Sequence, residues 1–184
     1  MKKLMLATAA TLGLLAFAPS AGMATARNNQ AATYQWVLEQ PNISRAPNGD
    51  TISLYSSTGL FSVHPKSANG GGSFTYTPAG GAPITGTWTV NGLITFQPYG
   101  CGVVFGNPLP PNFCGGKLKL DVTAHTPTGD VPAIVTVYCV IGNPPPSVRE
   151  GVRVVVPGVA NFNRQIEGMN VYIKQPPASR RASK

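Results

Sequence analysis

The sequence has few charged residues, few groups suited to acid–base chemistry and, after residue 26, no long hydrophobic run. Only 11% of its 184 residues are Asp, Glu, Lys or Arg, with six acidic residues and two histidines in total. A nucleic-acid-binding domain carries a basic face, and a membrane-spanning helix needs about 20 largely apolar residues. We therefore expect neither nucleic acid as a partner nor a membrane span after residue 26.

The net charge of +8 is concentrated towards the two ends of the chain. Six of the fourteen basic residues lie there: Lys2, Lys3, Arg27, Arg180, Arg181 and Lys184. We expect residues 176–184 to form a short basic disordered tail. Such a tail can touch an anionic envelope polymer.

Motifs for catalysis, metal binding and nucleotide binding are missing. The chain has no G-x-S-x-G nucleophile elbow and no zincin motif. Its glycine run at residues 70–72 precedes a predicted strand, so it lacks the helix N-terminus that phosphate binding uses. We expect no metal ion and no cofactor and name no catalytic residue. The sequence leaves enzymatic activity open, with the balance toward a non-catalytic role.

Residues 1–26 have the parts of a secretory signal peptide. A lysine pair follows Met1, residues 4–17 are mostly apolar, and Ala24-Thr25-Ala26 is a small-residue cleavage site. The apolar stretch is shorter than a membrane-spanning helix requires. We predict Sec-type export, cleavage after Ala26 and a secreted, extracellular location.

Residues 27–175 are predicted to form a single all-β domain. Apolar and polar residues alternate, and Gly, Pro and Asn interrupt the pattern about every ten residues. We predict an antiparallel β-sandwich of about ten short strands. A closed antiparallel β-barrel is the alternative, because both folds need alternation and regular turns. The predicted strands cover residues 33–39, 51–55, 60–64, 73–77, 85–90, 93–97, 117–125, 132–141, 152–156 and 169–173.

Two hairpins are predicted within this domain. Asn91-Gly92 suits a type I′ turn, which requires positive φ at both central positions, and would place Val90 opposite Leu93. The strands at 117–125 and 132–141 are expected to pair with Leu118 opposite Cys139, leaving one face apolar and the other polar. Residues 98–116, rich in Gly and Pro, are predicted to be irregular.

Three cysteines, Cys101, Cys114 and Cys139, follow the signal peptide. An exported protein enters an oxidising compartment, so we expect one disulfide and one spare thiol. The expected register turns Cys114 and Cys139 towards the core, which favours a bond between them. A bond between Cys101 and Cys114 is the next possibility.

The strand at 169–173 is expected to turn Met169, Val171 and Ile173 inward and Tyr172 outward. Tyr138 would also face outward, so Tyr138 and Tyr172 are the candidate binding residues if they lie on one face. Aromatic side chains on a wet face can stack against a sugar.

Three functions are compatible with these features. The first is a secreted, non-catalytic module that binds an unknown extracellular ligand. The second is a structural or envelope-associated protein, held by its basic tail to an anionic polymer. The third is a secreted hydrolase with a site built from Glu39, Glu150 or His64.

Overall fold

The computed structural model describes residues 32–176, which form fourteen β-strands. The predicted signal peptide, its cleavage site after Ala26 and residues 177–184 of the predicted tail lie outside the described residues. Within this part of the chain no helix has the length and apolar character needed to cross a membrane. The strands are β1 (Thr33–Leu38), β2 (Asn42–Arg45), β3 (Thr51–Ser62), β4 (Ser67–Ala68), β5 (Gly71–Thr77), β6 (Ile84–Cys101), β7 (Val103–Val104), β8 (Asn107–Pro108), β9 (Phe113–Thr126), β10 (Gly129–Cys139), β11 (Gly151–Val156), β12 (Ala160–Phe162), β13 (Arg164–Glu167) and β14 (Asn170–Lys174). The all-β prediction is confirmed.

Antiparallel hydrogen bonds join twelve of these strands into one sheet, and β7 and β8 form a separate ribbon. Strand β1 pairs with β3, β3 with β5, β5 with β6, β6 with β9, and β9 with β14. Strand β14 pairs with β1, which closes a circuit of six strands. Beside this circuit, β10 to β12 extend from β9, while β2 and β13 extend from β3. The predicted sandwich, which needs two separately paired sheets, is not confirmed.

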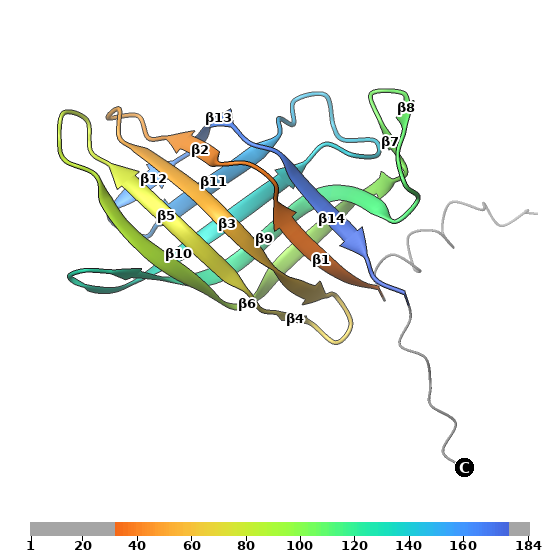
Figure 1. The fold of residues 1–184 in the computed structure, drawn as a ribbon, viewed down its shortest axis with the longest axis horizontal. Coiled ribbons are helices and arrows are strands. Elements are labelled where there is room, and N and C mark those ends of the chain that lie inside the picture. The colour runs from red at the N-terminus through yellow and green to blue at the C-terminus, as the bar shows by residue number, and fades with distance from the viewer. Residues whose placement is uncertain (1–31, 177–184) are drawn as a thin grey trace, which may run out of the picture.

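The core lies between strands that face each other across the molecule. In Figure 1, β1, β3 and β5 lie towards the viewer, and β9, β10 and β11 run behind them. Alternate residues of each strand point inward, as a half-buried strand requires. Tyr34, Trp36 and Leu38 of β1 are buried, and so are Leu118 and Leu120 of β9.

The predicted Asn91-Gly92 hairpin is wrong. Strand β6 continues through both residues and pairs with β5 on one side and β9 on the other. Gly92 has no positive φ and lies at a register shift in the β6–β9 pairing. Pairing with β5 and β9 provides hydrogen-bond partners for the backbone of β6. The Asn91-Gly92 pair therefore forms a bulge in an extended strand instead of a turn.

Two further predicted boundaries also change. The predicted strands at 51–55 and 60–64 belong mostly to one strand, β3, with an irregularity in its pairing to β5 around Ser56, whose φ is 50°. Residues 98–116 are irregular only in part, because β6 continues to Cys101, β9 begins at Phe113, and the β7–β8 ribbon lies between them.

The β9–β10 hairpin is confirmed, with its register shifted by two residues. Leu118 lies opposite Val137, not Cys139, because the turn is tighter than predicted and Thr126 pairs with Gly129. A shift by two keeps every side chain on its predicted face. The apolar face is therefore buried, as expected.

The prediction that Tyr172 faces outward from β14 is wrong, although Val171, predicted to face inward, is also buried. Tyr172 lies opposite Trp36 of β1 and is completely buried, whereas Met169 precedes the strand and is 50% exposed. Directly opposite residues of an antiparallel pair point to the same face. Because Trp36 points into the core, Tyr172 does so too.

Candidate apolar binding cavity

Strands from across the sheet line a half-open cavity of about 490 Å³, which we call the apolar cavity. Its walls are residues on the inner faces of β3, β5, β6, β9, β10, β11 and β12. They include Leu54, Phe74, Trp88, Val135, Val154 and Phe162. The same alternation that builds the core therefore also lines this space.

Two alanines help to explain why the core is hollow here. Further along their strands the inward residues are large, such as Leu118 and Leu120 on β9 and Val137 on β10. At the cavity β9 and β10 also contribute two much smaller inward residues, Ala124 and Ala133. Cores are normally packed to high density, and these short side chains leave space that their neighbours do not fill.

A hydrogen-bonded pair forms the polar part of the wall. The Tyr76 hydroxyl donates to Asp50 Oδ2 at 2.8 Å, and the backbone N–H of Ala79 donates to Asp50 Oδ1 at 2.8 Å. These bonds, first that from Ala79, lower the pKa of Asp50 below its usual value. Hydrogen bonding to the charged form favours it, so Asp50 is an ionised, fully engaged carboxylate.

Trp88 forms part of the wall and is 2% exposed. Its ring stacks against Trp36 at 5.6 Å between centroids. The Trp36 indole N–H donates to the carbonyl of Asn69, whereas the Trp88 Nε1–H has no hydrogen-bond partner.

Ile84 and Val159 also line the apolar cavity and are 42% and 80% exposed. Large exposed apolar residues beside a cavity are typical of ligand-binding surfaces. Asp50 and Tyr76 are the only titratable groups among the lining residues. The wall is therefore suited to an apolar molecule, and its two titratable groups are hydrogen-bonded to each other.

The candidate binding residues Tyr138 and Tyr172 are not brought together. Tyr172 is buried, its hydroxyl donates to the carbonyl of Val137 at 2.9 Å, and burial raises its pKa well above the usual value. Tyr138 remains partly exposed on the outer face of β10, where the Arg153 guanidinium lies 5.2 Å from its ring centre. The pairing of these tyrosines as an outward platform is therefore wrong.

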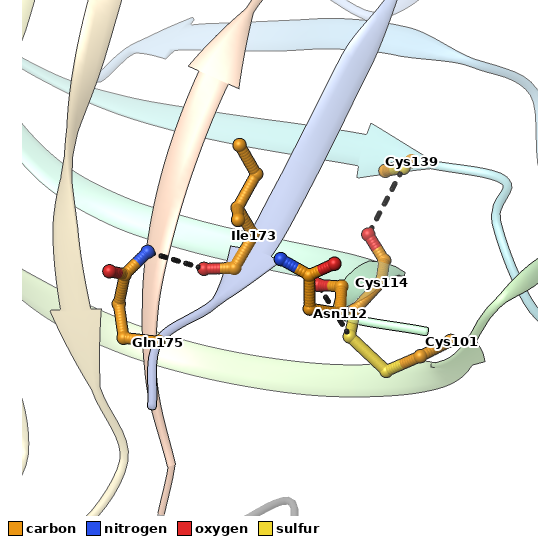
Figure 2. The surroundings of a disulfide bond; sticks show 6 residues. All are labelled: Cys101, Asn112, Cys114, Cys139, Ile173 and Gln175. Carbon is orange, nitrogen blue, oxygen red and sulfur yellow. Dashed lines mark hydrogen bonds between the residues drawn. A yellow bond between two sulfur atoms is a disulfide. The ribbon is translucent and has the colours of Figure 1, made fainter. Parts of the chain in front are cut away.

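The disulfide joins Cys101 and Cys114, the second of the two pairings considered, and the favoured Cys114–Cys139 bond is wrong. Cys101 lies directly opposite Cys114 in the β6–β9 pairing. Cys139 lies across the other edge of β9, opposite Gly116, and is a buried free cysteine. Figure 2 shows its thiol directed at the carbonyl of Cys114 while the Cys114 sulfur bonds to Cys101.

The three residues considered for a hydrolase do not form a common site. Glu39 follows β1, at the end of the β1–β3 pair where Leu38 lies opposite Ser57. His64 follows β3, at the other end of this pair, where Thr33 lies opposite Ser62. Both carboxylate oxygens of Glu150 accept backbone N–H groups, from Val140 and Asn170. Glu150 is therefore committed to structural hydrogen bonds.

Sequence reasoning missed the apolar cavity because each lining residue resembles an ordinary core residue. The available signal was the pair of inward alanines, Ala124 and Ala133, in strands whose other inward residues are large. Comparison with protein-family models, curated proteins and solved structures finds no match to this chain.

Proposed function

We propose that the chain is a secreted, non-catalytic binding protein that holds a small apolar molecule in the apolar cavity. The cavity itself is the observation that carries this proposal. Its volume of about 490 Å³ falls within the range of about 300–1,000 Å³ typical of small-molecule sites. Its wall is apolar except at Asp50, Tyr76 and two threonines, Thr126 and Thr128.

The strand pairings support the same proposal. The circuit from β1 through β3, β5, β6, β9 and β14 fits the alternative architecture considered from the sequence, a closed antiparallel barrel. Small barrels can hold one small ligand among their inward side chains, and here the cavity lies between four strands of the circuit, β3, β5, β6 and β9, and the adjoining strands β10 to β12. The Cys101–Cys114 disulfide fits the oxidising compartment that the predicted signal peptide implies.

The ligand is expected to be mainly hydrocarbon, with at most one polar group. An apolar ligand gains roughly 25 cal/mol for each Å² removed from water, whereas a buried polar group must find a hydrogen-bond partner. The Tyr76 hydroxyl already donates to Asp50, so its oxygen can accept a hydrogen bond from a ligand hydroxyl.

Binding of the neutral apolar dye N-phenyl-1-naphthylamine tests this function. The test variant is Ala133→Leu, which adds volume inside the cavity, and the matched control is Ala68→Leu, which adds the same volume at a partly buried position that does not line it. We expect the wild type and control to bind with micromolar affinity and the test variant to bind at least roughly tenfold more weakly.

Far-ultraviolet circular dichroism and thermal unfolding establish that both variants are folded, because overpacking can itself destabilise a core. Equal dye binding by a folded Ala133→Leu variant and the wild type would contradict the proposal. Organic extraction of protein purified from the producer's medium, followed by mass spectrometry, would identify a retained ligand directly.

A further inference from the structure

A second hollow, with a volume of about 250 Å³, lies on the outer face of the sheet. Its floor includes Gln97 of β6, Lys117 of β9 and Tyr138 of β10, which occupy opposite positions on three neighbouring strands. Its rim is the proline-rich connector from β10 to β11, through Pro145 and Arg149. We call this space the cationic hollow.

Three cations line the cationic hollow, Lys117, Arg149 and Arg153, and no acidic residue does. Among the described residues none of these cations forms an ion pair with a carboxylate. Clustered like charges without counter-charges repel one another, and a bound anion would relieve that repulsion.

The guanidinium of Arg153 is already positioned. Its Nε–H donates to Gln165 Oε1 at 3.1 Å, and its carbon lies 5.2 Å from the centre of the Tyr138 ring. The amide of Gln165 is itself fixed, since its nitrogen donates to the carbonyl of Arg149 at 2.8 Å. The terminal nitrogens of Arg153 make no hydrogen bond with the described residues and form a fork suited to a carboxylate.

The rim is restrained before any ligand arrives. Residues 144–146 are three consecutive prolines, each with a fixed φ. The N–H of Val148 donates to the carbonyl of Pro145 at 2.9 Å, which closes a turn. Glu150 ties the end of the connector to Val140 through a 2.8 Å hydrogen bond. A restrained site loses less conformational freedom when it binds.

We propose that the cationic hollow binds an acidic sugar residue, a pyranose ring that carries a carboxylate. The carboxylate pairs with Arg153, and Lys117 and Arg149 add charge. Tyr99 and Tyr138 also line the hollow, and the parts of their rings that Arg153 leaves uncovered can contact the apolar face of the sugar. This site is independent of the apolar cavity and of the function proposed for it.

Neutral polar groups favour a sugar over a bare anion. Gln97, Ser147 and Gln165 line the hollow beside the cations, and amides and hydroxyls match the donors and acceptors of ring hydroxyls. A sulfate ion can accept from the cations and from these donors, but it has no hydroxyl groups to donate to the amide oxygens.

Titration of the full exported chain by two-dimensional NMR tests the site with four probes: sodium glucuronate, glucose, sulfate and phosphate. We expect glucuronate to bind in the millimolar range and to shift the amide signals of residues 138, 149 and 153. Glucose and both inorganic ions should bind at least roughly tenfold more weakly. Sulfate or phosphate binding as tight as that of glucuronate would overturn sugar recognition, and so would the absence of glucuronate shifts.

Variants then locate the binding. Arg153→Gln and Tyr138→Leu should each raise the Kd for glucuronate roughly five- to tenfold. Arg164→Gln, which removes an exposed arginine that does not line the hollow, is the matched control and should leave the Kd unchanged. An unchanged Kd in Arg153→Gln, or an equal rise in Arg164→Gln, would overturn the assignment to this hollow. Folding of each variant is checked from its spectrum.

Discussion

Glu150, which directly precedes β11, is hydrogen-bonded to Asn170, the first residue of β14. Glu150 Oε1 accepts the backbone N–H of Asn170 at 2.8 Å, and the Asn170 side-chain amide donates to the carbonyl of Tyr138 at 2.9 Å. Burial raises the pKa of Glu150 to about 7, although the bonds from Val140 and Asn170 act in the opposite direction. The residue that anchors the connector thus changes its charge near neutral pH.

Stability should therefore depend on pH through Glu150. Its pKa is raised from an ordinary 4.5 to about 7, so the folded state binds the proton more tightly than the unfolded state. The stabilisation is complete below about pH 4.5 and is lost as pH rises to about 7, at no more than about 1.4 kcal/mol per pH unit. Urea denaturation at several pH values measures this loss.

The Glu150→Gln variant should remove most of that slope. It should also lower stability by about 1–3 kcal/mol, because an amide oxygen can replace only one of the two carboxylate acceptors and its NH₂ group faces a donor. Glu39→Gln, at an exposed position, is the control and should keep the wild-type slope. A wild-type slope in Glu150→Gln would assign the pH dependence to another group.

The thiol of Cys139 should be unreactive in the folded protein. It is fully buried, and burial raises its pKa to about 12, so the reactive thiolate is scarce. Iodoacetamide should leave the native protein unlabelled and, after denaturation without reductant, add a single label at Cys139. Peptide mapping that places this label on Cys101 would contradict the observed pairing.

Loss of the disulfide should destabilise the fold. Cys101 and Cys114 are separated by 13 positions, and closing a loop of about this length is worth roughly 3 kcal/mol. The double variant Cys101→Ser, Cys114→Ser should lose about this amount in urea denaturation. Wild-type protein measured in reductant is the control, and it should match the double variant within about 1 kcal/mol.

Gly92 distinguishes the observed path of β6 from the predicted hairpin, and Gly115 of β9 provides a contrasting, tightly packed position. A methyl group at Gly92 would meet open space, whereas one at Gly115 would lie 2.0 Å from the carbonyl oxygen of Ile141. Gly92→Ala should change stability by less than about 1 kcal/mol, and Gly115→Ala should cost at least about 3 kcal/mol. A large loss in Gly92→Ala would instead indicate a turn that requires positive φ at that position. Thermal unfolding of both variants provides the comparison.

Features that depend on neighbours in the sequence were predictable. The inward faces of β1 and β11 follow from simple alternation, and the β9–β10 hairpin follows from its turn residues. Its register still differed from the predicted one by two residues. Thr126 and Gly129, which were expected to lie in the turn, pair with each other, and this depends on backbone geometry that the sequence pattern does not reveal.

Features that depend on distant strands were not predictable. The Asn91-Gly92 pair favours a turn, and only the presence of β5 and β9 on both sides of β6 makes an extended path better. The orientation of Tyr172 is set by its partner Trp36, far away in the sequence. The disulfide likewise required the β6–β9 pairing, and neither hollow is visible until the strands are assembled.

The first and last strands of the described chain, β1 and β14, lie side by side (Figure 1) and pair directly. During synthesis β1 emerges first but cannot complete its pairing until β14 has left the ribosome. A fold that waits for its final segment forms slowly, because contacts between distant residues must form late. We expect such a chain to complete its fold only after synthesis, which is compatible with the Sec-type export predicted from its sequence.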